Sequence, residues 1–238
     1  MPVNVQRGFM RVLGIVEHHV TVVGVQDRAP WLRRVRFFGA SLVDAPEGLP
    51  GEWIRLWVPD ASQEGLLRQR GYIVVAFSRE GGWFDLDMVL HEPDGPASAW
   101  ARAVRPGAEA VVSLSKYGSA HVGKAGPLTL LGDLSSLPAI ESICADAHSA
   151  NGRDDRRIRV FLDAQGHQVE GILSAHGAEV TLTDNPVGAL ERLGSPGHVW
   201  AGLGRARITE LRGVLKRANH PRQQSYARAY WIEGKAFA

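Results

Sequence analysis

The sequence predicts two units of different fold class, a six-stranded antiparallel β-barrel followed by a doubly wound α/β domain with a parallel sheet. Three observations support this prediction. Up to residue 122, β-rich stretches follow one another at hairpin spacing, with only one short helical stretch. From residue 127, strand-like and helix-like stretches alternate. The segment between them, "HVGKAGPL", contains two glycines and Pro127, which is typical of a linker. The predicted domains are therefore 1–122 and 127–238.

The six strands of the barrel are expected in the first half of the chain. They are predicted at 18–30, 31–39, 52–59, 72–79, 83–91 and 108–115. The stretch "WFDLDMVL" shows the clearest pattern, because its apolar residues alternate with Asp85 and Asp87, as in a half-buried strand. Glu80-Gly81-Gly82 separates two of these strands and indicates a hairpin turn.

A single helix is predicted in this half, at 97–103, directly after the strand that ends near His91. Gly95 allows the turn and Pro96 suits the first helical position, where its missing N–H has no cost. The N–H groups of Ala97 and Ser98 would then have no partner within the helix, and such a helix start can bind an anion. The ordinary alternative is a helix start capped by Asp94 that binds nothing, and for this segment alone it is the more common case.

The second half of the chain repeats strand and helix. Strands are predicted at 127–133, 157–164, 178–184, 197–204 and 225–234, and helices at 135–148, 169–177, 186–194 and 206–218. Units of this length imply a parallel sheet with helices on both faces. The strand that ends in "LLGD" places Gly132 and Asp133 at the edge where such sheets bind nucleotides.

Composition limits the classes of function. The chain has 238 residues, 45% of them apolar, and a formal charge of +2, so neither nucleic acid nor a membrane is expected as the main partner. Cys144 is the one cysteine, which excludes an internal disulfide and favours a reducing cytoplasm. No apolar run approaches the roughly 18 residues of a membrane-spanning helix, and no signal peptide is expected at the N-terminus.

Four segments resemble, in the right order, motifs of the siderophore-interacting proteins. These are "RGYIVV" (70–75), "LHEPDGPASAWA" (90–101), "GDLSSLPAI" (132–140) and "YWIEGK" (230–235). The family consists of FAD-dependent ferric-siderophore reductases related in fold to ferredoxin–NADP reductases. The resemblance therefore implies an FAD-binding barrel at 1–122 and an NAD(P)H-binding α/β domain at 127–238.

The resemblance assigns a set of residues to cofactor binding. Arg70 would face the FAD phosphates and Tyr72 would pack on the flavin, with Gly71 and Ile73 beside them in the same strand. Taken without the resemblance, Tyr72 is equally well a barrel-core aromatic and Arg70 a solvated loop-end charge. The remaining residues implied to contact FAD or the nicotinamide nucleotide are His91, Gly95, Pro96, Ala97, Ser98, Gly118, Ser119, Gly132, Asp133, Ser136, Gly202 and Trp231.

Four positions depart from the family pattern. Ile73 and Val75 replace a threonine and an arginine expected beside the flavin and its phosphates, so weaker FAD binding is expected. Leu134 and Leu203 replace acids on the nicotinamide side, a change that is equally explained by drift at solvent-facing loop positions. No Gly-x-Gly-x-x-Gly motif occurs, which disfavours an ordinary NAD dehydrogenase.

Two functions are open at this point. The first is a flavin-dependent reductase that passes electrons from NADH or NADPH through FAD to a ferric siderophore and releases the iron. The second is a repurposed protein of the same fold that has lost flavin or nicotinamide function and binds a small molecule or catalyses a non-redox reaction. A basic segment at 205–235 could attract an anionic substrate or the NADPH 2′-phosphate, or could be a solvated helix face.

Overall fold

The computed structural model describes residues 15–44, 51–60, 65–114, 126–149 and 156–234. The chain divides into two compact units, Met1–Ser119 and Ala120–Phe237. Most of the linker between residues 122 and 127 lies outside the described residues, so the predicted position of that boundary stays a prediction.

The first unit is a closed antiparallel barrel of six strands, as predicted. The strands are β1 (Glu17–Ala29), β2 (Leu32–Phe38), β3 (Trp53–Pro59), β4 (Leu67–Ser78), β5 (Trp83–Val89) and β6 (Glu109–Leu114). Their order around the barrel is β1-β2-β5-β4-β3-β6, which removes any free sheet edge. A 3₁₀ helix, η1 (Ala40–Asp44), follows β2, and helix α2 (Pro96–Ala103) connects β5 to β6.

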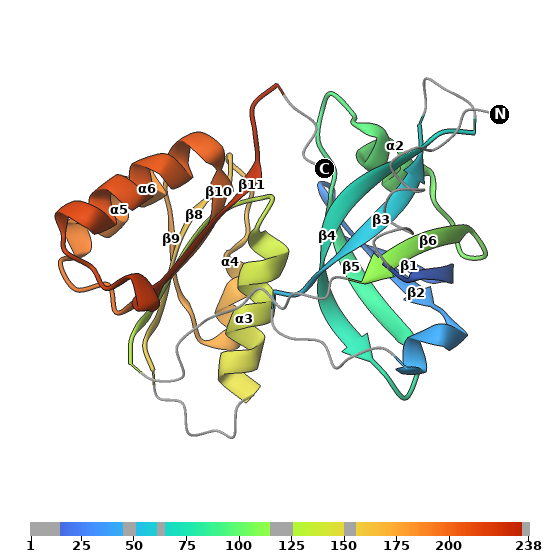
Figure 1. The fold of residues 1–238 in the computed structure, drawn as a ribbon, viewed down its shortest axis with the longest axis horizontal. Helices are drawn as coiled ribbons and strands as arrows, with labels where there is room; N and C mark the ends of the chain where they lie inside the picture. Colours follow the sequence, from blue (N-terminus) through green and yellow to red (C-terminus); the bar gives the residue numbers. More distant parts are fainter. Residues whose placement is uncertain (1–14, 45–50, 61–64, 115–125, 150–155, 235–238) are drawn as a thin grey trace. The chain divides into compact units, whose positions relative to one another are not determined.

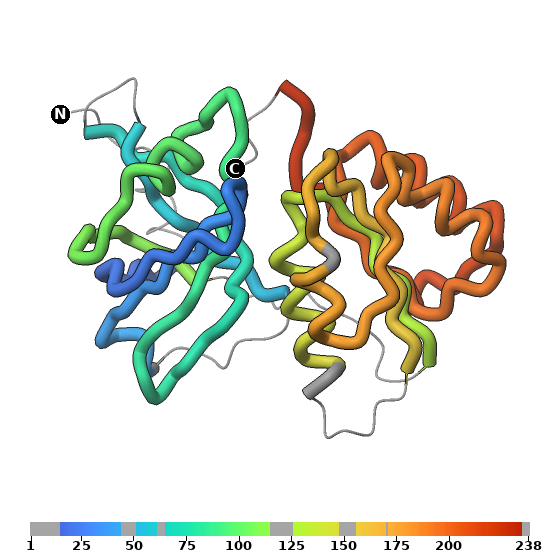
Figure 2. Tube along the Cα trace, turned by 180° about the vertical axis from the view of Figure 1, so that it is seen from behind, coloured from blue at the N-terminus to red at the C-terminus, as the bar shows by residue number. Residues whose placement is uncertain are grey.

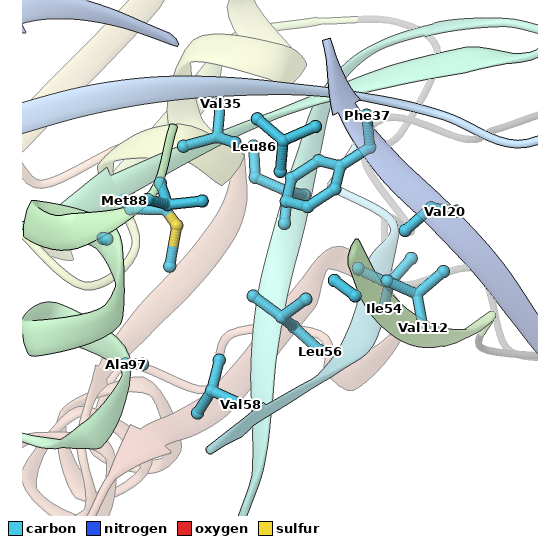
Figure 3. Packing of buried hydrophobic residues seen from close by; sticks show 14 of the residues in the cluster. Val20, Val35, Phe37, Ile54, Leu56, Val58, Leu86, Met88, Ala97 and Val112 are labelled. Carbon is cyan, nitrogen blue, oxygen red and sulfur yellow. The ribbon is translucent and has the colours of Figure 1, made fainter. Parts of the chain in front are cut away.

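The alternating pattern of the strands builds the barrel interior. Phe84, Leu86 and Met88 of β5 are fully buried and pack with core residues of β2 and β3. Figure 3 shows Leu86 and Met88 among the side chains of Phe37 and Leu56 inside the barrel, with Ala97 of α2 at the margin of the cluster. The Phe37 and Phe84 rings stack with their centroids 4.9 Å apart. The period of two in the sequence therefore fixes which face of each strand is buried.

Two carboxylates on the outer face of β5 are buried as well. Asp87 is 2% exposed and accepts hydrogen bonds from Arg34 (Nε to Oδ1, 2.7 Å) and from Arg28. Asp85 is 1% exposed and binds both Nε and Nη2 of Arg36, at 2.7 and 2.8 Å. Because β2 lies beside β5, the pairs of Arg34 and Arg36 connect neighbouring strands across the outside of the barrel, and Arg28 of β1 reaches Asp87 across β2.

The second unit is a five-stranded parallel sheet. Its strands are β7 (Leu128–Asp133), β8 (Ile158–Asp163), β9 (Glu179–Leu182), β10 (His198–Gly204) and β11 (Ser225–Trp231), in the order β11-β10-β7-β8-β9. Its helices are α3 (Leu137–Ser149), α4 (Glu170–Leu173), α5 (Pro186–Leu193) and α6 (Arg205–Arg217), and the 3₁₀ helices are η2 (Ser174–His176) and η3 (Arg222–Gln224).

Helices cover both faces of this sheet. Figure 1 shows α5 and α6 on one face and α3 and α4 on the other, and the view from behind in Figure 2 shows the same two layers. Strand order reverses at β7, whose neighbours are β8 on one side and β10 on the other. The carboxyl ends of β7 and β10 therefore flank the place where sheets of this kind bind ligands.

The helix predicted at 169–177 is the main local difference. The structure has a four-residue helix, α4, followed by the 3₁₀ helix η2. Gly171 lies within α4 and disfavours helix propagation, and Gly177 ends η2 in the left-handed region at φ 71°. Among the described residues, no helix has the length and apolar content needed to cross a membrane.

Substituting Asn for Asp87 tests the ion pairs on the barrel surface. The change keeps the shape of the side chain but removes the carboxylate that Arg28 and Arg34 share, and the side chains of these arginines are only 19% and 26% exposed. We expect the free energy of unfolding to fall by about 3 kcal/mol, the lower end for a broken buried ion pair, because both guanidinium groups retain some contact with water. Urea denaturation measures this change.

Glu179→Gln is the matched control, because Glu179 pairs with Arg157 at 2.7 Å on an exposed surface. Exposed pairs contribute little, so this variant should unfold at the same urea concentration as the parent protein. Equal midpoints for the Asp87 and Glu179 variants would show that the barrel does not depend on its buried carboxylates.

Candidate functional site

Arg70 of β4 differs from most arginines of the barrel in having no carboxylate partner among the described residues. Its guanidinium is half-buried and donates from Nη1 to the carbonyl of Gln69 at 2.7 Å. The barrel arginines that do pair with a carboxylate are Arg28, Arg33, Arg34, Arg36, Arg68 and Arg102. A half-buried guanidinium without a counter-charge is suited to bind a phosphate or carboxylate ligand.

Tyr72 lies two residues along the same strand and is half-buried against the barrel core. Burial raises the pKa of its phenol well above the ordinary value, while the charge of Arg70 acts in the opposite direction. The ring therefore stays neutral and offers an apolar face together with a hydrogen-bonding group. Both readings of Tyr72, as a core aromatic and as a cofactor contact, are compatible with this position.

The two residues that depart from the family pattern on β4 occupy different environments. Ile73 is 7% exposed and lies opposite Trp53 of β3. Val75 lies between Val74 and Ala76, where the register of β4 against β5 shifts and a β-bulge forms. Gly71, the other predicted contact on this strand, lies beneath the Trp53 ring.

The backbone N–H groups at the start of α2 have no side-chain cap, and the Asp94 carboxylate lies beside them. Gly95 is the N-cap residue and supplies no side-chain cap, so the interpretation that Asp94 caps the helix is wrong. Asp94 instead accepts the Ser98 hydroxyl at 2.6 Å and pairs with Arg102 at 3.0 Å. Hydrogen bonds from Ser98 and Arg102 lower the pKa of the Asp94 carboxyl.

His91 completes the loop before α2. Its ring Nδ1 lies 2.8 Å from the carbonyl of Pro93, and its backbone N–H donates to the Ser98 hydroxyl at 3.2 Å. A Cβ at Gly95 would lie 3.6 Å from the His91 ring, so these predicted residues are brought together. Ala97 and Ser98 are 6% and 2% exposed. The ionised Asp94 at this helix start opposes a second anion there, and the anion site at Ala97 and Ser98 stays a prediction.

In the α/β unit, Gly132 and Gly202 let the start of α3 approach two strands closely. They are register partners on β7 and β10. A Cβ at Gly132 would lie 2.4 Å from the Ser136 hydroxyl oxygen, and one at Gly202 would lie 2.8 Å from Ser136 Cβ. Ser136 is fully buried, and its hydroxyl bonds with the backbone N–H and carbonyl of Asp133. These residues have a structural role at the point where strand order reverses, and their predicted ligand contacts stay predictions.

Asp133 at the end of β7 is 6% exposed, and its carboxylate accepts hydrogen bonds from two other residues. Its Oδ1 accepts the backbone N–H of Ser135 at 2.9 Å and the Ser135 hydroxyl, and its Oδ2 accepts the indole N–H of Trp231 at 2.8 Å. Burial raises the pKa of this carboxyl, against the hydrogen bonds from Ser135 and Trp231, and the charge of Asp163 adds to the rise. Two predicted site residues, Asp133 and Trp231, are thus joined by a hydrogen bond.

Leu134 and Leu203 are both buried, at 6% and 2% exposure. The interpretation of these positions as solvent-facing is therefore wrong. Leu203 packs in the apolar cluster of β10 and α6 with Ile208 and Leu211. An acid at either position would be buried without an evident partner, so leucine is the residue that this packing favours.

Several arginines of the basic segment at 205–235 form ion pairs or hydrogen bonds within the α/β unit. Arg207 pairs with Glu210 at 2.9 Å, Arg217 pairs with Glu191 at 2.9 Å, and Arg212 donates to the carbonyl of Ala227. Gly118 and Ser119, the two remaining predicted contacts, lie outside the described residues. Gly204 and Tyr230 were not among the predicted contacts, although Tyr230 begins the segment "YWIEGK"; Gly204 lies against Trp231 and Gly202 lies against Tyr230, because of a bulge in β11.

A closed antiparallel barrel followed by a doubly wound parallel sheet defines the ferredoxin-reductase type of fold. Two family models match the chain, the siderophore-interacting FAD-binding domain at residues 64–114 and the siderophore-interacting protein at residues 125–234. The chain belongs to the siderophore-interacting protein family, as the resemblance predicted.

Solved structures agree with this fold. A siderophore utilization protein from T. fusca superimposes with a TM-score of 0.78 at 23% identity, covering 93% of this chain and 95% of that one. The ferredoxin reductase in carbazole 1,9a-dioxygenase, in its FAD apo form, gives a TM-score of 0.67 at 17% identity, covering 90% and 66%.

A curated relative extends well beyond this chain. The mycobactin import ATP-binding/permease protein IrtA of Mycolicibacterium thermoresistibile is 34% identical over 249 aligned residues. The alignment covers 97% of this chain but only 27% of the relative. This chain thus spans about a quarter of that protein's length.

The residues of the barrel fit an FAD molecule. Arg70 supplies a positive charge that no described carboxylate neutralises, and Tyr72 supplies a half-buried aromatic ring on the same strand. The residues of the α/β unit fit a nucleotide less completely, because Asp133 and Ser136 have already used their side-chain hydrogen bonds within the fold.

Substituting Ala for Gly202 tests the close approach of α3 to the sheet. The added methyl would lie 2.8 Å from both Ser136 Cβ and Tyr230 Cε2 and 2.9 Å from the Trp200 ring. Since three groups would have to move, we expect unfolding of the α/β unit to require about 1–3 kcal/mol less free energy. Thermal unfolding followed by circular dichroism measures the loss. Gly171→Ala, where a Cβ meets nothing within 4 Å, is the control and should not lower stability.

Proposed function

We propose that this protein is an FAD-dependent reductase that takes electrons from NADH or NADPH and delivers them to a ferric siderophore. The observation that carries the proposal is Arg70, a half-buried guanidinium without a carboxylate partner on the strand that also presents Tyr72. Membership of a family whose barrel is described as FAD-binding supports the same cofactor.

The residues of the barrel would each have a distinct part in binding. Arg70 would pair with the phosphates of FAD, because a guanidinium forms two parallel hydrogen bonds with phosphate oxygens. Tyr72 would pack its ring against the cofactor, and its raised pKa keeps the phenol neutral and able to donate a hydrogen bond. His91, Gly95 and Ser98 would border the cofactor at the start of α2.

The chemistry belongs to the cofactor and the iron. Bound FAD would accept a hydride from the nicotinamide and supply its two electrons, one at a time, to two ferric ions. Ferrous iron has a lower charge and is bound less tightly by hard oxygen donors, so reduction releases the metal. The protein needs no general acid or base for this reaction, and its contribution is to bind and orient.

A second candidate function is a member of the fold that no longer uses a nicotinamide nucleotide. It is favoured by the carboxyl edge of the parallel sheet, where Leu134 and Leu203 are buried and Ser136 is enclosed. In that case the barrel would still bind FAD or another anionic molecule, but NADH and NADPH would not reduce it.

Substituting Gln for Arg70 tests the cofactor site. Loss of one charge-assisted phosphate contact should weaken FAD binding about 10- to 100-fold, measured by titrating the apoprotein and following flavin fluorescence. Arg68→Gln is the control, because Arg68 is already paired with Asp60 at 2.5 Å. The double variant Ile73→Thr, Val75→Arg should bind more tightly than the parent protein. Equal affinities for the Arg70 and Arg68 variants would remove the main support for this site.

The reductase reaction itself is tested without oxygen. Protein loaded with FAD is mixed with NADPH, or with NADH, and a ferric hydroxamate or ferric mycobactin-type complex, together with a chromogenic ferrous chelator. We expect ferrous iron to appear in proportion to the NAD(P)H consumed, at two ferrous ions for each nicotinamide. A protein that holds FAD but whose flavin spectrum is unchanged by both nucleotides would support the second candidate and contradict the first.

A further inference from the structure

The last strand of the α/β unit, β11, contains a bulge that changes the direction of one aromatic side chain. Opposite β10, Leu203 pairs with Ala229 and Gly204 pairs with Trp231, so Tyr230 is the extra residue in β11. A β-bulge allows two successive side chains to lie on the same side of a strand. Such bulges are over-represented next to active sites, where they direct a side chain.

Contacts with two glycines show where these side chains lie. Gly202 and Gly204 are two residues apart in β10 and share one face of the sheet. A Cβ at Gly202 would lie 2.8 Å from the Tyr230 ring, and one at Gly204 would lie 2.6 Å from the Trp231 indole. Tyr230 and Trp231 therefore both lie on the face that carries Ser136 and the start of α3.

The two aromatic residues differ in exposure and partners. The phenol of Tyr230 is half-buried, with its ring set edge-on to Trp200 at a centroid distance of 6.0 Å. Trp231 is 41% exposed, although its indole rests directly on Gly204. One side of the indole thus contacts the backbone at the end of β10 while a large part of the ring remains open to solvent.

The bond to Asp133 fixes the orientation of this exposed ring. An exposed indole can rotate about two side-chain torsions, and a hydrogen bond to its single N–H removes that freedom. The acceptor, Asp133, is itself immobilised by the backbone and hydroxyl of Ser135. The ring is consequently held at the carboxyl edge of the sheet by a buried charge on β7, two strands away from its own strand.

We propose that Asp133 is a positioning residue, which holds the Trp231 indole over Gly204 as a fixed flat surface on which the flavin or nicotinamide ring of a bound cofactor stacks. Stacking on a preoriented ring loses less conformational entropy than stacking on a freely rotating one. The identity of the stacked ring, flavin or nicotinamide, rests on the proposed function. The orientation of Trp231 by Asp133 does not.

The first experiment measures the orientation in the full-length protein without any ligand. Tryptophan indole N–H groups are observed by ¹⁵N–¹H NMR, and the Trp231 resonance is assigned from its loss in Trp231→Phe. The charged groups and ionisable side chains that face Asp133 are Asp163 on β8 and Tyr230 on β11. We expect the Trp231 resonance to shift with pH as Asp133 titrates, with a midpoint above the ordinary carboxyl value of about 3.9, because burial raises this pKa.

Matched variants identify the group that titrates. Asp133→Asn should abolish the pH-dependent shift of the Trp231 resonance. Asp163→Asn is the control, because Asp163 lies opposite Asp133 on the neighbouring strand and bonds with the backbone of Gln165 instead. It should keep the shift, at a slightly lower midpoint. Persistence of the full titration in the Asp133 variant would overturn the proposal.

The second experiment measures the stacking. FAD and, separately, oxidised NADP⁺ are titrated into the protein while the Trp231 resonance is followed, and AMP is the probe that carries an adenine but neither flavin nor nicotinamide. We expect FAD or NADP⁺, and not AMP, to shift the resonance by its ring current. Asp133→Asn and Trp231→Phe should weaken that ligand about fivefold or more, as followed by ligand fluorescence or calorimetry, while Asp163→Asn should not.

The outcomes separate this proposal from the proposed function. If FAD binds tightly, as shown by its absorbance, but neither FAD nor NADP⁺ moves the Trp231 resonance, the stacking surface is wrong and the flavin reductase stands. If FAD does not bind at all, the proposed function fails. The stacking proposal is then decided by whether NADP⁺ shifts the Trp231 resonance. Trp231→Phe keeps an aromatic ring but removes the N–H donor together with the five-membered ring of the indole. Asp133→Asn leaves the indole intact, so unchanged affinity in that variant would show that orientation by Asp133 has no effect on binding.

Discussion

The close approach of α3 to β7 and β10 is the constraint on which the α/β unit depends. Gly132 and Gly202 lie side by side, and Ser136 fills the space that their side chains would occupy. This contact closes the sheet surface at the point where strand order reverses. A ligand at this edge must therefore bind outside the ends of the strands, where Asp133 and Trp231 lie.

In the part of the chain that the structure describes, the barrel, unlike the α/β unit, buries two carboxylates that are paired with arginines. On its outer face, Asp85 and Asp87 are buried among arginines, whose ion pairs join β5 to its neighbour β2 and, through Arg28, to β1 beyond it. Arg36 also packs over the Trp83 ring at 3.9 Å, which shields the pair further. Arg70 stands apart because its charge is not used to hold strands together. The barrel contains many arginines, and the register of the strands decides which of them meet a carboxylate, as Arg34 and Arg36 do, and which do not among the described residues, as for Arg70.

Most of the architecture could be predicted from the sequence, because alternation and strand–helix spacing follow directly from burial. The hairpin at Glu80-Gly81-Gly82 is an example, since β4 ends at Ser78 and β5 begins at Trp83. Glycines, apolar periods and the four family segments located the two units and their edges. Bulges were not predictable, because the extra residues Val75 and Tyr230 have no distinctive composition.

The side-chain pairs of the candidate site were harder to predict for the same reason. The bond between Asp133 and Trp231 joins residues 98 positions apart, and nothing in either segment indicates the other. The burial of Leu203 depends on the packing of α6, which a linear pattern cannot show. Asp94 was placed at the correct helix start but in the wrong role, since its carboxylate binds the Ser98 hydroxyl rather than capping the backbone.

Closure of the barrel has a consequence for how the chain folds as it is made. β1 and β6 are the first and last strands of the unit, and they pair Glu17 with Ser113. The ring of hydrogen bonds cannot form until the sixth strand has left the ribosome, so the early strands must wait with two unpaired edges. Once β6 emerges, the unit can complete itself before the parallel sheet is synthesised, since all its strands precede that sheet in the chain. The interval in which the hairpins of the open barrel have emerged but cannot yet close is thus when the nascent protein is most exposed to aggregation.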